Sequence, residues 1–188
     1  FSVGARIEHP QKLIDKAQYG AFAGHPKLGA ADYKLSCHGL HQRGAYTFCM
    51  CPGGTVVAAA SEKGGVIVNG MSTLARDGEN ANSALLVGID PVDFPSEHPL
   101  AGMYYQREIE QNAFALGGGD YRAPAQLVGD FLADRESRSL GNVQPTCPTG
   151  VTLTNLRYCL PDKVRTTMQA AITEMDKRLH GFALPDAV

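Results

Sequence analysis

Two cysteines stand two residues apart in the stretch Tyr46 to Gly54, which reads YTFCMCPGG. Such a pair suits three kinds of chemistry: zinc ligation, thiol redox exchange, or the floor of a site for a flat cofactor. If Cys49 and Cys51 lie on one strand, their side chains share a face and their Cα atoms are about 6.6 Å apart. Parallel Cβ vectors at that separation are poor geometry for a disulfide. The alternative for both thiols is burial as small hydrophobic side chains, with Cys51 the more exposed of the two at the turn.

A zinc site is the second use of these thiols. Cysteine and histidine are the residue types that tetrahedral zinc prefers, but the spacings match no paired Cys-x-x-Cys pattern. The metal hypothesis therefore remains secondary. The candidate ligands are Cys37, His38, His41, Cys49 and Cys51.

The turn Pro52-Gly53-Gly54 leaves backbone amides without side-chain cover. Glycine permits positive φ and lets another group approach the main chain closely. The turn either joins two strands in the ordinary way or lies against the face or polar edge of a cofactor. From these residues alone, the ordinary turn is favoured.

Hydrogen-bonding side chains are dense between residues 69 and 82. Asn and Ser favour turns for local reasons, so a solvated loop is one interpretation. The same groups can supply donors to a carbonyl-rich heterocycle or to a carboxylate. The candidate binding residues are Asn69, Ser72, Arg76, Asn80 and Asn82.

The elements that position these groups are strands in the first half of the chain. Val3, Ala5 and Ile7 alternate with Gly4 and Arg6, which is the period of a half-buried strand. A short helix is expected after Pro10. Further strands are expected over 32–38, 44–51, 55–61, 65–69 and 83–89.

The second half of the chain has the periodicity of helices. Helices are expected over 99–116, from Pro124 onward, and over 161–180, where Val164, Met168 and Ile172 recur at helical spacing. The predicted fold is therefore α+β: a β-rich, barrel-like lobe of about six strands over residues 1–95, then a helical lobe over 96–188.

Composition excludes several classes of protein. The chain has 188 residues, 44% hydrophobic and 19% charged, as in ordinary globular domains. A formal net charge of -2 without a Lys/Arg cluster argues against nucleic acid or an anionic membrane as partner. Apolar runs are too short to cross a bilayer. Five cysteines, an odd number, without a signal peptide predict reduced thiols and a cytoplasmic location.

Long phrases of the sequence resemble a group of bacterial FAD-dependent dehydrogenases of poorly defined substrate. The resemblance covers essentially the whole chain, although no glycine-rich phosphate-binding fingerprint is present. The phrases are FSVGARIEHPQKLIDKAQYG, RGAYTFCMCPGGTVVAAASE, NGMSTLARDGENANSALLVG, YRAPAQLVGDFL and LPDKVRTTMQAAITEMDKRLHGFALPDAV.

The resemblance implies a domain cut from a longer polypeptide, in which it is inserted between two parts of a nucleotide-binding domain. That domain, in the same parent chain, would be its partner and would hold FAD, while the insert would form the substrate-side wall of the active site. The isolated domain is expected to be inactive and to bind FAD weakly, because the phosphates have no cradle here. The alternative is a non-catalytic binding or interaction module, with or without zinc.

The resemblance also implies roles for individual residues. The residues close to the isoalloxazine ring would be Cys51, Pro52, Gly53 and Gly54. Asn69, Ser72, Arg76, Asn80 and Asn82 would orient a small-molecule substrate or the polar edge of the flavin. Cys51 is the one catalytic candidate, and a structural thiol is its alternative role.

Overall fold

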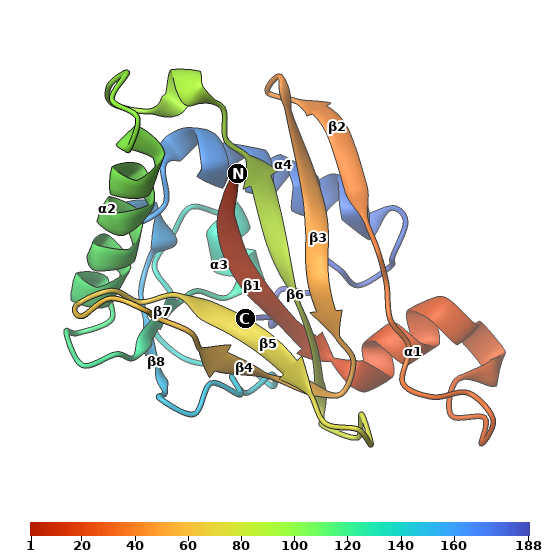
Figure 1. Ribbon diagram of the computed structural model, residues 1–188. Coiled ribbons are helices and arrows are strands. Elements are labelled where there is room, and N and C mark those ends of the chain that lie inside the picture. Colours follow the sequence, from red (N-terminus) through yellow and green to blue (C-terminus); the bar gives the residue numbers. More distant parts are fainter.

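A four-stranded antiparallel sheet organises the chain, in the order β1-β6-β3-β2 (Figure 1). The computed structural model describes residues 1–188. The sheet strands are β1 (Ser2–Pro10), β2 (Ser36–Leu40), β3 (Arg43–Cys51) and β6 (Asn80–Gly88). Strands β1 and β6 pair along their whole length, from Ser2 opposite Gly88 to Pro10 opposite Asn80. This register fixes which side chains share each face of the sheet.

One face of the sheet is buried under the last helix, α4 (Asp162–Asp176), which packs against all four strands and lies behind the sheet in Figure 1. Ile7 and Leu85 are buried on this face. The buried side chains of α4 recur at helical spacing, as the sequence predicts. They are Val164, Thr167, Met168, Ala171, Ile172 and Met175.

The other face carries a two-stranded antiparallel ribbon of β4 (Gly54–Ala58) and β5 (Val68–Ser72). The ribbon crosses in front of the sheet in Figure 1, and the helix α2 (Ala101–Leu116) stands beside it. A short parallel pair, β7 (Ala123–Ala125) and β8 (Val151–Leu153), joins α2 on this side. These elements leave part of the sheet face uncovered between them.

The remaining elements are short. Helix α1 (Gln11–Tyr19) follows β1 directly, and α3 (Val128–Leu132) lies between β7 and β8 in the chain. Three 3-10 turns complete the structure: η1 (Gly20–Phe22), η2 (Pro91–Asp93) and η3 (Leu156–Tyr158). None of the helices combines the length and apolarity that crossing a bilayer requires.

The α+β class is confirmed, although the strands form three separate sheets and close no barrel. The helix predicted to begin at Pro124 is wrong: Pro124 lies in β7, and α3 begins at Val128. Proline has no N–H to donate, and it is tolerated here because β7 pairs on one side only. The division into a β-rich lobe and a helical lobe near residue 95 stays a prediction. Buried side chains from both halves, such as Leu85 and Met175, belong to one cluster.

Candidate functional site

Arg6, on β1, contacts several of the polar groups that the sequence analysis named as candidates. Its Nε donates to Asn82 Oδ1 at 2.7 Å, and its Nη2 donates to the carbonyl oxygen of Cys49 at 2.5 Å. Nη1 makes a long contact of 3.4 Å with Asn69 Oδ1, and Nη2 lies 3.6 Å from Cys51 Sγ. Strands β1, β3, β5 and β6 thus meet at one guanidinium.

No carboxylate of the chain forms an ion pair with Arg6. Burial lowers the pKa of the Arg6 guanidinium, and the nearby Cys51 thiol acts in the opposite direction. Arginine nevertheless stays protonated in proteins. The cluster therefore contains a partly buried cation whose hydrogen-bond acceptors are neutral.

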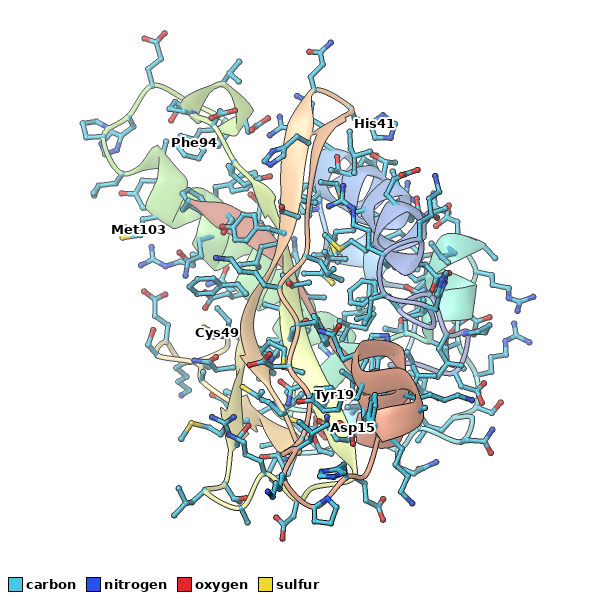
Figure 2. The ribbon with its side chains drawn as sticks, turned by 90° about the vertical axis from the view of Figure 1, so that its right-hand side faces the viewer. Asp15, Tyr19, His41, Cys49, Phe94 and Met103 are labelled. Carbon is cyan, nitrogen blue, oxygen red and sulfur yellow. The ribbon has the colours of Figure 1, made fainter.

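A β-bulge separates the two cysteines of β3. The pairing with β6 shifts register between Phe48 and Cys51, and Cys49 has φ of +44°. Cys49 is exposed, on the side of the sheet opposite α1 in Figure 2, whereas Cys51 is buried. The expectation that Cys51 is the more exposed thiol is wrong: Cys51 is buried and Cys49 is exposed, and the bulge inserts an extra residue between them.

The turn Pro52–Gly54 is packed within the domain. Gly53 N–H donates to Gln11 Oε1 at 2.7 Å, and the Ser72 hydroxyl donates to the carbonyl of Pro52 at 2.7 Å. A Cβ at Gly53 would overlap the backbone carbonyl of Arg76. The two glycines thus allow the loop after β5 to lie directly on the turn, while the Arg76 side chain is exposed.

Asn80 belongs to a neighbouring cluster around Glu8. Its Nδ2 donates to Glu8 Oε2 at 3.1 Å and to the carbonyl of Gln144 at 2.9 Å. Thr146 donates its backbone N–H to Glu8 Oε1 at 3.0 Å and its hydroxyl to Glu8 Oε2 at 2.6 Å. The structure therefore brings Asn69 and Asn82 to Arg6, and places Asn80 and Ser72 in adjoining networks.

A cavity of about 490 Å³ lies between the uncovered sheet face, the β4–β5 ribbon, α2 and the β7–β8 pair. Its walls are mostly hydrophobic, and Arg6 is the one cationic side chain among the lining residues. Exposed lining residues, Phe1, Ile67 and Gln106, mark where it reaches solvent. This volume is within the range of small-molecule sites.

Sequence reasoning missed this cavity and the part that Arg6 takes in it. Arg6 and Glu8 stand at alternate positions of β1, opposite in direction to Ile7. That alternation is also the pattern of a strand with one face in water, so it did not distinguish a solvated face from a cavity wall. One feature of the sequence could have indicated the cavity wall: Arg6 and Glu8 lie on the same face of the strand as Gly4.

The cysteine and histidine residues considered for zinc do not gather. Cys37 is buried, with its Sγ 4.0 Å from the carbonyl of Ala171 on α4, whereas Cys49 is exposed. No group of three or more His, Cys, Asp or Glu side chains is arranged to hold a metal ion. All five cysteines are free thiols.

The fold and the site together describe an α+β domain with a largely apolar cavity and one cation at its wall. Across residues 1–188 the chain matches the family described as FAD-dependent protein, C-terminal domain-like, and it belongs to that family. An uncharacterized protein of Clostridium beijerinckii is 53% identical over 189 residues, covering 100% of this chain and 36% of that protein. The chain thus spans about a third of the length of this relative.

Proposed function

We propose that this chain is the substrate-side domain of an FAD-dependent dehydrogenase, inserted in a nucleotide-binding domain that holds FAD. The flavin supplies the electron transfer, and this domain forms one wall of its site. The observation that supports the proposal is the cavity with Arg6 in its wall, because a largely apolar space with one cation suits a small-molecule substrate. Family membership supports the association with FAD.

The residues of this chain do not fit the phosphates of FAD. The Gly53-Gly54 turn after β3 is filled by the chain's own backbone and by Gln11, so it offers no cradle for phosphates. The one parallel pair of strands, β7–β8, has three residues in each strand. The phosphates and the adenosine are therefore assigned to the rest of the parent chain, and only the ring side to this domain.

Exposed hydrophobic side chains near the Cys51–Gly54 turn support this assignment. Phe48 is 57% exposed, Met71 62% and Leu74 fully exposed. Met71 lies beside the turn, since a Cβ on Gly54 would come within 2.5 Å of its carbonyl oxygen. Large apolar side chains left exposed on neighbouring elements favour a surface that a partner covers. We assign that role to the FAD-binding part of the parent, because 36% coverage of the relative leaves most of its length outside this domain.

The exposed thiol of Cys49 gives a direct test in the full-length parent. The natively purified parent should contain flavin, and alkylation of Cys49 by iodoacetamide should be at least about tenfold slower with FAD than after its reversible removal. A cysteine introduced as Thr173→Cys, exposed on α4 at the opposite side of the sheet, is the matched control and should react equally in both states. A parent that neither contains nor takes up flavin refutes the function. If the parent contains flavin but Cys49 is alkylated at the same rate with and without it, the position of this domain beside the flavin is refuted. The association with flavin then still stands.

A further inference from the structure

We propose that the cavity binds a small amphipathic carboxylic acid, with its carboxylate at Arg6 and its apolar body between the sheet and α2. The assignment of this ligand as the substrate rests on the proposed function. The binding site itself rests on the charges, hydrogen bonds and walls of the cavity.

The charge of Arg6 is not balanced within the protein. Elsewhere in the chain, Arg43 pairs with Asp93 and Arg107 pairs with Glu62. Arg6 has only carbonyl, amide and thiol partners, and the one hydrogen bond of its Nη1 is long, at 3.4 Å. A partly buried guanidinium without a counter-ion favours an anionic ligand, and a carboxylate can accept two parallel N–H bonds from it.

A second donor beside Arg6 also lacks an acceptor. Asn82 is fully buried and its Nδ2 has no hydrogen-bond partner, while its Oδ1 accepts from Arg6. Turning the amide around would set its NH2 group against the Arg6 Nε–H, so the unpaired donor follows from the arrangement. Buried donors without partners are rare and costly. The cluster around Arg6 thus has more donors than acceptors, and since Asn82 does not line the cavity, the guanidinium alone is assigned to the ligand.

The two carboxylates of the cavity wall do not compete for this role. Both oxygens of Glu8 already accept hydrogen bonds, from Thr146 and Asn80. Glu110, on α2, accepts from Gln106 at 2.7 Å. A cationic ligand would thus find no free acceptor near Arg6 and would be repelled by the guanidinium.

The rest of the cavity suits an apolar chain or ring. The walls opposite and beside Arg6 come from the ribbon, β6, α2 and β8. They include Val56, Val68, Leu86, Ile109 and Val151. Removing apolar ligand surface from water against such walls is favourable, at about 25 cal/mol per Å². A carboxylic acid with an alkyl or aryl body matches both parts of the cavity: its carboxylate pairs with Arg6, and its body contacts the apolar walls.

Calorimetric titration of the flavin-loaded parent with octanoate, octanol and octylamine tests this inference. Octanoate should bind at least about tenfold more tightly than octanol, and octylamine should not bind. Arg6→Met should weaken octanoate at least about tenfold and leave octanol unchanged, whereas Arg138→Met, an exposed arginine outside the cavity, should change neither. If Arg6→Met does not fold, Ile109→Trp serves instead: it fills the cavity with Arg6 intact and should weaken both octanoate and octanol.

The outcomes separate this inference from the proposed function. Equal affinity for octanoate and octanol overturns the anchoring role of Arg6. A flavin-containing parent that binds none of the three probes overturns the ligand site and leaves the flavin assignment standing. Octanoate binding by a parent without flavin supports the ligand site and removes only its connection to flavin chemistry.

Discussion

Arg6 and Asn82 bond diagonally across two neighbouring strands, since Arg6 stands opposite Ala84 and Asn82 stands opposite Glu8. The diagonal pair carries the guanidinium toward the place where β5 crosses the sheet. Gly70 of β5 lies there, and a Cβ on it would overlap both Arg6 Nη2 and Asn82 Oδ1. The close approach of β5 to this pair therefore requires glycine at position 70.

Replacing Gly70 by alanine should push the Arg6 side chain away from Asn82. The new Cβ overlaps both Arg6 Nη2 and Asn82 Oδ1, so the guanidinium must move and the buried amide or β5 must shift with it. We expect a loss of about 1–3 kcal/mol in the free energy of unfolding, the usual cost of overpacking, and weaker octanoate binding. Urea denaturation and titration measure the two effects. Gly88→Ala is the control, because nothing lies within 4 Å of its Cβ position, and a similar loss there would contradict the steric argument.

Replacing Thr146 by valine should destabilise the domain. The change removes the hydroxyl that donates to Glu8 Oε2 and accepts from the backbone N–H of Val56 at 2.8 Å. Leaving buried partners unsatisfied costs about 1–3 kcal/mol each, more for a charged group. Denaturant unfolding at neutral pH measures the loss. Thr55→Val, on the exposed side of β4, is the matched control, and equal effects at the two sites would refute the role of the Glu8 network.

His9 should make the fold lose stability as the pH falls from about 6.5 toward 4. Burial lowers the pKa of His9 to about 4, against the opposing effects of its bond to the Phe182 carbonyl and of Asp176. In this pH window the unfolded chain binds a proton that the folded chain does not, so stability rises with pH by up to about 1.4 kcal/mol per unit. Unfolding free energies measured across the window should show this slope, and His9→Gln should reduce it. His25→Gln changes an exposed histidine and should leave the slope as it is.

Cys51→Ser in the flavin-loaded parent should leave flavin content and turnover with an artificial electron acceptor nearly unchanged. The Cys51 thiol is buried and donates to the carbonyl of Cys49 at 3.2 Å, a bond that serine can keep. The expected cost is about 1 kcal/mol in stability, from altered packing. Cys49→Ser controls for the loss of a thiol nearby. Loss of turnover with flavin retained would instead give Cys51 a redox role.

The regular parts of the fold follow from the sequence, and the site follows only in part. The spacing of Val164, Met168 and Ile172 predicts α4, and the alternation of Val3, Ala5 and Ile7 predicts β1, because each pattern is set by local geometry. Which strands pair depends instead on contacts between distant segments. The juxtaposition of Arg6 with Asn82 arises only from the pairing of β1 with β6, and periodicity within either segment does not show it.

The bulge at Cys49 and the cavity escape sequence reasoning for different reasons. A non-glycine residue at positive φ carries little signal in its own identity, and cysteine is not a residue type that favours it. The cavity is a space between α2, the ribbon and the sheet, and its volume depends on how these elements are placed. By contrast, Asn69 and Asn82 were found as candidates because polar amides in a short segment are visible in the sequence itself.

The two faces of strand β1 have different roles, and this affects which of its positions can vary among members of the family. Ile7 and His9 hold the strand to the interior, whereas Gly4, Arg6 and Glu8 form the cavity wall. Of the second set, Arg6 is the position open to change. A Cβ at Gly4 would overlap the backbone carbonyl of Leu85. Glu8 is buried and accepts hydrogen bonds from Thr146 and Asn80, so its replacement would destabilise the domain. We therefore expect relatives that bind other ligands to differ at position 6 while keeping positions 4, 7, 8 and 9. A change of ligand in this lineage would need few mutations, because the scaffold is inherited independently of the specificity it carries.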